Sequence, residues 1–316
     1  MHRKHVIYVL KMTLACLVCI FLLDRLVYAV LSRLSDNVYS GQSVGKLNYF
    51  MNNNENFDIV FLGNSRVSRH IIAKDIGAKT LNAGVDGTYI FYSTILFDLL
   101  PHDLPQTIFF HVDPSLAIDS TYAGADVMFL QAFYHKIDEV ASRIDESGMR
   151  NSFNPYLKSI DYNGSFLAVI TNSVISRNSF EKNAGYEPNY ITPKQQKQLK
   201  RQIEKFYQTE EQCSVNVQIS PLYKESLVKL KTLAAERNKR LIFFTSPRFG
   251  DRCKNDNILF RQYMDSLQLT YIDDTDYFAE NNKFEYWKDY VHMADDGARL
   301  YTERINRIID SLGIAR

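Results

Sequence analysis

The sequence predicts an α/β protein with three layers around a mostly parallel five-stranded sheet, preceded by an N-terminal transmembrane helix. Two observations predict this arrangement. Short apolar runs alternate with helical patterns through the body of the chain, as in doubly wound parallel sheets. A nearly uncharged apolar segment lies close to the N-terminus. The composition, 46% apolar and 23% charged, is that of a folded chain and excludes disordered and collagen-like proteins.

Residues 1–35 are expected to form a membrane anchor. A basic cluster, His2–His5, precedes the run Val6–Leu23, in which Lys11 is the only charged residue. This run of about 18 residues approaches the roughly 20 that span a bilayer, provided that Lys11 extends its amine toward the surface. The basic end is expected to stay inside the cell. The pattern also fits a buried core helix, or a signal peptide cleaved after Val27-Tyr28-Ala29.

The body is expected to occupy residues 57–316, after a linker over 36–56. Five apolar runs predict the strands: Phe57–Gly63, Lys79–Asn82, Thr107–Val112, Arg240–Thr245 and Leu269–Ile272. Helical patterns fall between and after them, at Ile90–Leu100, Leu222–Arg237, Asn257–Leu267 and Gly297–Leu312. This order predicts a flavodoxin-like fold.

The stretch from about 122 to 220 does not follow the alternation. It is rich in Asn, Ser, Lys and Gln and has mixed helical signals, such as Lys194–Tyr207. We therefore expect a largely helical insertion between the third and fourth strands. Such an insertion could shape access to a substrate, or only add stability.

The charge and the cysteine positions exclude some classes of function. The net charge is +1 and no basic block recurs, which argues against a nucleic-acid partner. Cys16 and Cys19 lie in the apolar segment, whereas Cys213 and Cys253 lie in the body, so a four-cysteine metal site is excluded. Cys213 and Cys253 could pair in an oxidising compartment. No phosphate loop or metal-ligand spacing occurs, and we expect neither a metal nor a cofactor.

Ser65 is the candidate nucleophile. It lies in Gly63-Asn64-Ser65-Arg66, directly after the first predicted strand, where the carboxyl edge of a parallel sheet binds ligands. A serine there becomes a nucleophile if a base reaches its hydroxyl, and N–H groups of the turn can stabilise an oxyanion. The same pattern is also common at a helix N-cap.

The candidate base is His292. It follows Asp289 in an Asp-x-x-His pattern just before the last predicted helix. An aspartate at this spacing can hold the imidazole in the tautomer that accepts a serine proton. The alternative is an ordinary hydrogen-bonded surface turn, followed by Asp296 as a helix cap.

These motifs together resemble the SGNH/GDSL hydrolase superfamily. Gly-x-Ser-Arg follows the first strand, Leu81-Asn82-Ala83-Gly84 follows the second, and Asp-x-x-His precedes the last helix. The resemblance covers roughly Asp58 to Leu312 without the insertion, and it is closest to membrane-anchored bacterial envelope members. It implies a serine hydrolase with a Ser-His-Asp triad.

The resemblance also assigns individual roles. It makes Ser65 the nucleophile, Asp289 and His292 its partners, and the N–H groups of Ser65 and Gly84 the oxyanion donors. The family's third motif would add an asparagine after the third strand, but Val112-Asp113-Pro114 stands there. Loss of one such donor lowers the rate about 10²- to 10³-fold.

Three neighbours of the motifs are candidate substrate-binding residues. Asn64 and Asn82 lie near enough in the motifs to replace the missing donor. Arg66, beside the nucleophile, could bind an anionic sugar or a lipid phosphate, or it could pair with a core carboxylate.

We therefore expect a membrane-anchored serine esterase or O-acyltransferase, with its catalytic domain in the periplasm or outside the cell. Its expected substrates are O-acylated envelope polysaccharide, peptidoglycan or lipid. One alternative is a non-catalytic envelope assembly or binding protein that keeps the fold. Another is a helper of an integral-membrane acyl-transfer system, similar to the D-alanine transfer protein of teichoic acids.

Overall fold

The computed structural model describes residues 2–77, 79–175, 180–208, 213, 218–251 and 253–315. Its centre is a five-stranded, all-parallel sheet of order β2-β1-β3-β4-β5. The strands are β1 (Ile59–Leu62), β2 (Thr80–Asn82), β3 (Gln106–His111), β4 (Lys239–Thr245) and β5 (Tyr271–Asp273). The fold class and all five predicted strands are thereby confirmed, each shifted by no more than a few residues.

Helices surround the sheet and connect its strands. The α-helices before the insertion are α1 (His2–Ser35), α2 (Val44–Asn53), α3 (Ser65–His70), α4 (Ile90–Asp98) and α5 (Pro114–Ala117). Those within it are α6 (Asp138–Ser147), α7 (Phe166–Val174), α8 (Phe180–Asn183) and α9 (Pro193–Gln208). Those after it are α10 (Pro221–Glu236), α11 (Lys254–Ser266) and α12 (Asp295–Ser311). The 3₁₀ helices are η1 (Asn54–Asn56), η2 (Ala73–Asp75), η3 (Ala125–Phe133), η4 (Lys158–Tyr162), η5 (Ala279–Asn281) and η6 (Phe284–Tyr286).

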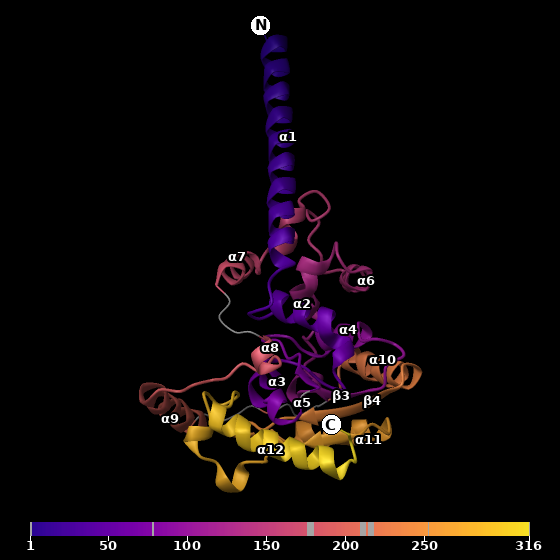
Figure 1. Ribbon diagram of the computed structural model, residues 1–316. Coiled ribbons are helices and arrows are strands. Elements are labelled where there is room, and N and C mark those ends of the chain that lie inside the picture. The colour runs from indigo at the N-terminus through magenta and orange to yellow at the C-terminus, as the bar shows by residue number, and fades with distance from the viewer. Residues whose placement is uncertain are drawn as a thin grey trace.

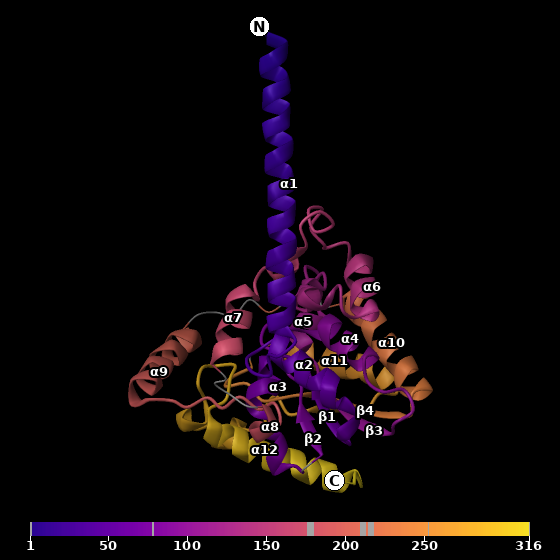
Figure 2. The same ribbon diagram turned by 45° about the horizontal axis from the view of Figure 1, so that its top comes forward.

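The two faces of the sheet bury separate apolar cores. Alternate residues of a strand point to opposite faces, so Val60 and Phe61 of β1 belong to different cores. Helices α2, α4 and α10 pack on the Val60 side, and α3 and α12 pack on the Phe61 side. Figures 1 and 2 show α12 on the side of the body opposite α1. All four residues of β1 are buried, as expected for a central parallel strand.

Where the structure describes the insertion between β3 and β4, its regular elements are helices, joined by turns and loops. It contains η3, α6, η4, α7, α8 and α9, and no strand lies in its described residues. Its η4 and α7 contact the C-terminal part of α1. The insertion therefore lies partly beside the N-terminal helix, where α7 flanks α1 in Figure 1.

Helix α1 projects away from the body (Figure 1). It is long and apolar enough to cross a membrane, and 0% of its most apolar window is buried in the protein. It could therefore anchor the protein in a membrane or be a signal sequence. The segment 36–56, expected as a linker, contains α2, whose Val44, Leu47 and Phe50 are buried in the core.

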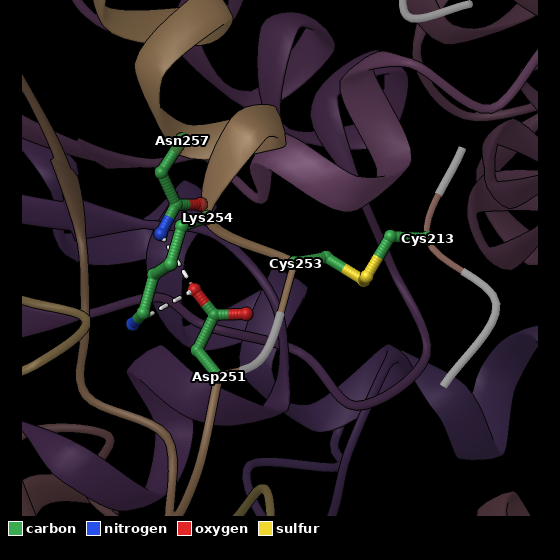
Figure 3. The surroundings of a disulfide bond; sticks show 5 residues. All are labelled: Cys213, Asp251, Cys253, Lys254 and Asn257. Atoms are coloured by element: carbon green, nitrogen blue, oxygen red, sulfur yellow. Dashed lines mark hydrogen bonds and ion pairs between the residues drawn. A yellow bond between two sulfur atoms is a disulfide. The ribbon is translucent and has the colours of Figure 1, made fainter. Parts of the chain in front are cut away.

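A disulfide joins the insertion to the loop after β4. Cys213 and Cys253 are bonded, with their Cα atoms 5.4 Å apart (Figure 3). Beside it, Asp251 Oδ2 accepts hydrogen bonds from Asn257 and Lys254. Because disulfides persist in oxidising compartments, this bond indicates that the body lies outside the cytoplasm.

Candidate active site

Ser65 lies in a tight turn between β1 and α3. Gly63 has φ +150°, and a Cβ there would come within 2.6 Å of the Cβ of His111, so only glycine fits. The side chain of Asn64 then caps α3 by accepting a hydrogen bond from the backbone N–H of Arg66 (3.0 Å). As a result, Ser65 is the first residue of α3 and lies at the carboxyl edge of the sheet.

His292 lies in a short loop that is fixed at both ends. Trp287 and Met293 form an antiparallel bridge, and both side chains are fully buried. Between them, Asp289 Oδ1 accepts hydrogen bonds from the backbone N–H groups of Val291 and His292, each at 2.8 Å. The spacing of Asp289 and His292 is therefore set by the backbone of the loop itself.

The structure brings Ser65, His292 and Asp289 into one hydrogen-bonded chain. His292 Nε2 lies 2.7 Å from Ser65 Oγ, and His292 Nδ1 lies 2.9 Å from Asp289 Oδ2. Burial alone would raise the pKa of the Asp289 carboxyl, but the hydrogen bond and charge of His292 and the loop N–H groups together lower it. Asp289 is thus an acceptor for Nδ1–H, which leaves Nε2 free to accept the Ser65 proton. The side chains of His292 and Asp289 are 27% and 37% exposed, so solvent reaches the site.

Gly84 and Asn82 lie close to this site, but the backbone N–H of Gly84 is hydrogen-bonded to the side chain of Asn82. The Gly84 N–H donates to Asn82 Oδ1 (3.1 Å), and Asn82 Nδ2 donates to the carbonyls of Val67 and Ile71 (both 2.7 Å). Asn82 is 1% exposed. It thus secures α3 from inside the protein and presents no free group to a substrate, and the Gly84 N–H already has an acceptor.

Arg66 points into the protein rather than toward a substrate. It is 1% exposed, and its guanidinium pairs with Asp113 (3.0 Å) and donates to the hydroxyl (3.1 Å) and carbonyl of Ser246. Burial would raise the pKa of Asp113, but Arg66, Arg248 and Ser115 outweigh it and lower that pKa to about 2. Asp113 is therefore ionised at neutral pH and has no proton to donate to an oxyanion.

The sequence did not reveal that Ser246 joins two buried histidines. His70 Nε2 accepts the N–H of Met293 (3.0 Å), so its proton is on Nδ1, which donates to Ser246 Oγ (3.0 Å). Ser246 Oγ in turn lies 3.2 Å from His111 Nε2. The only signal in the sequence was position, because His111 and Ser246 both stand at the carboxyl ends of neighbouring strands. Through Met293, this network positions the backbone next to His292.

Hollows lie at both edges of the sheet, and neither of the two described next is lined by Ser65 or His292. A polar cavity of about 100 Å³ lies at the carboxyl edge, lined by Asp113, Ser115, Thr245 and Arg248 among others. A larger hollow of about 570 Å³, lined by Gln106 and Lys239 among others, lies at the amino edge and hence away from Ser65. Within the described residues, no group of three or more His, Cys, Asp or Glu side chains could hold a metal ion.

Comparison with known proteins gives no family. The chain matches no protein-family model, and no curated protein is similar to it in sequence. The structure itself establishes an α/β fold with a five-stranded, all-parallel sheet.

Proposed function

We propose that this protein is a membrane-anchored SGNH-type serine esterase or O-acyltransferase of the cell envelope. One observation carries the proposal: Asp289, His292 and Ser65 form a continuous hydrogen-bonded chain at the carboxyl edge of a parallel sheet. Geometry of this kind, rather than sequence position, identifies a Ser-His-Asp triad. The resemblance of the three motifs to the SGNH/GDSL superfamily supports the same proposal.

The proposed reaction proceeds through an acyl-enzyme. Ser65 Oγ attacks the ester carbonyl carbon while His292 Nε2 takes its proton, and Asp289 stabilises the imidazolium. Collapse of the tetrahedral intermediate breaks the bond to the alcohol, which leaves with the proton from His292. Water or a sugar hydroxyl then attacks the acyl-enzyme, with His292 again acting as the base. Hydrolysis and acyl transfer differ only in this second acceptor.

The oxyanion donors are fewer than the resemblance implies. As the first residue of α3, Ser65 has a backbone N–H without an intrahelical partner, and it supplies the main donor. Gly84 would have to share its N–H with Asn82. Asp113 stands where an asparagine was expected and is ionised. These features favour a slow hydrolase, or a transferase in which acceptor or partner groups complete the site.

Two features support the proposed location, with the body outside the cytoplasm and α1 in the membrane. The disulfide supports a body outside the cytoplasm. Asp24 of α1 is 6% exposed and accepts hydrogen bonds from the backbone of Lys158 and Ser159, and cleavage after Ala29 would remove this contact. These contacts support our proposal that the helix is retained as a single-pass anchor. An envelope location in turn favours O-acylated envelope polysaccharide or lipid as the substrate class.

A second candidate function is partner-dependent or non-catalytic envelope assembly. The ionised Asp113 at the expected asparagine position favours it, because the oxyanion site then lacks a side-chain donor. In its partner-dependent form, an integral-membrane protein supplies the acyl group to Ser65.

Labelling with a fluorophosphonate tests the proposal. The full chain in detergent should be phosphonylated at Ser65, identified by mass spectrometry of the modified peptide. Ser65→Ala should abolish the label and His292→Ala should reduce it greatly, because the hydroxyl is activated by the imidazole.

His102→Ala is the matched control, because His102 is exposed in the loop before β3. It should label as the wild type does. A folded wild-type protein that stays unlabelled would contradict an autonomous triad and favour the second candidate function.

A further inference from the structure

The loop 151–157 of the insertion presents two aromatic side chains to solvent. Phe153 is 62% exposed and Tyr156 is 71% exposed. Single exposed apolar residues are common, whereas neighbouring exposed rings form an apolar patch, and such patches mark protein or membrane interaction sites. They stand three residues apart, and the Tyr156 N–H donates to the Phe153 carbonyl (3.0 Å), which keeps the two residues in one turn.

The exposure of these rings does not come from a loose loop. Asn154, between them, is fully buried, and its Nδ2 donates to Asp161 Oδ1 (2.6 Å). Arg150, just before the loop, donates to Asp161 Oδ2 (3.3 Å). Asn154 and Arg150 thus tie the loop to Asp161, while its two rings remain outside.

This loop is attached to α1 at the end of its apolar run. Arg25 Nη2 donates to the Tyr156 carbonyl (3.3 Å), and Asp24 Oδ1 accepts from Ser159 Oγ (2.6 Å) and its N–H (2.9 Å). Asp24 and Arg25 directly follow Val6–Leu23 in the sequence. At 1.5 Å per residue, that run is about 27 Å long, close to the hydrocarbon thickness of about 30 Å. The bilayer surface therefore falls near Asp24, at the level of the loop.

We propose that Phe153 and Tyr156 enter the interfacial layer of the outer face of the bilayer beside α1. This inference rests on the proposed retention of α1 as a membrane anchor. The occupant of the surface is lipid, because the surface is continuous with the spanning helix and aromatic rings partition to the membrane–water interface. With α1, the loop gives the body a second contact with the membrane and fixes its orientation, so that Ser65 is held at a constant height above the lipid.

Tryptophan fluorescence in the full chain tests this contact. Single variants Phe153→Trp, Leu17→Trp and Tyr190→Trp are reconstituted in phosphatidylglycerol–phosphatidylethanolamine vesicles, with or without lipids brominated near the carbonyl end of the acyl chain. The native Trp287 is fully buried in the body and gives a constant background. F153W should lose fluorescence when brominated lipid is present.

The other two variants distinguish failure of the loop's membrane contact from failure of the membrane anchor. L17W, in the apolar run of α1, should also be quenched, whereas Y190W should not, because Tyr190 is 75% exposed but lies near the loop of His292. Quenching of L17W without quenching of F153W would overturn the membrane contact and leave the anchor intact, as expected if the loop binds a protein partner instead. Absence of quenching in both would show that the proposed anchoring itself fails.

Discussion

Two polar clusters include residues of α3, and they contain the same functional groups but differ in burial. The triad of Ser65, His292 and Asp289 is partly exposed and held by a surface loop. The second cluster, which we call the buried network, consists of Arg66, His70, His111, Asp113 and Ser246. The exposed fractions of Arg66, His70, His111 and Ser246 are 4% or less. Both clusters contain imidazole, a carboxylate and a serine hydroxyl.

The difference shows that the position of a histidine, rather than its residue type, decides whether it is suited to catalysis or to a structural role. In the proposed triad, His292 faces the Ser65 hydroxyl and would take up its proton during the proposed reaction. In the buried network, His70 uses both ring nitrogens for fixed hydrogen bonds, to Met293 and Ser246. The proposed proton transfer therefore concerns His292, whereas the fixed hydrogen bonds of His70 hold the backbone beside it in place.

The largest expected effect is a loss of labelling rate when the proposed triad is changed at Asp289. Asp289→Asn keeps an oxygen for the N–H groups of Val291 and His292 but favours the wrong imidazole tautomer. The rate of fluorophosphonate labelling at Ser65 should fall by about 10⁴-fold, the effect of the same change in a well-studied triad. Thermal unfolding should change little, because Asp289 is 37% exposed. An unchanged labelling rate would show that Asp289 does not orient His292.

The next effect concerns the buried network and should appear in stability. Arg66→Met removes the ion-pair partner of Asp113 and leaves the carboxylate with only the more distant charge of Arg248 and the hydrogen bond of Ser115. Breaking a buried pair in this way costs about 3–5 kcal/mol of unfolding free energy, measurable by urea denaturation. Arg299→Met is the control, because Arg299 is 61% exposed in its pair with Asp295, and such pairs contribute about 0–1 kcal/mol. Equal losses in the two variants would contradict the assigned difference in burial.

The same comparison explains which parts of the fold were predictable. Strand and helix positions follow from local apolar patterns, so all five strands were found from the sequence. The segment 36–56 was expected to be a linker because of its Asn-rich end, although Val44, Leu47 and Phe50 of α2 pack into the core. The contact of Asp24 with the insertion joins residues 134 and 135 positions apart and leaves no local signal.

The candidate site was predictable as a set of edge positions but not as side-chain directions. Ser65 and His292 could be paired because each stands beside a helix start in a motif with chemical meaning. Nothing local shows that Arg66, the next residue, turns inward to Asp113 and Ser246. Those partners lie 47 and 180 residues away, and only packing brings them together.

The smallest expected effect is a pH dependence of stability that originates in the buried network. Burial first, and then the charge of Arg66, lower the pKa of both His70 and His111 well below 6.5. His292 and His111 lower that of His70 further, and Arg248 that of His111, where Asp113 opposes the shift. The unfolded chain therefore binds more protons than the folded one below the ordinary histidine pKa, so stability is full above about pH 6.5 and falls with acidification.

Each of these two histidines should remove about 1.4 kcal/mol of unfolding free energy between about pH 7.5 and about pH 5.5. His70→Gln keeps an acceptor for the Met293 N–H, and His111→Gln keeps one for Ser246; each should remove about half of the combined slope. His102→Gln, at an exposed position, should leave the slope as it is. Urea denaturation at a series of pH values gives the slope for each variant. If His70→Gln and His111→Gln both retained the full slope, the acid sensitivity would originate outside the buried network. In that case the buried network would position His292, but keeping His70 and His111 neutral would not lower the free energy of unfolding at acidic pH.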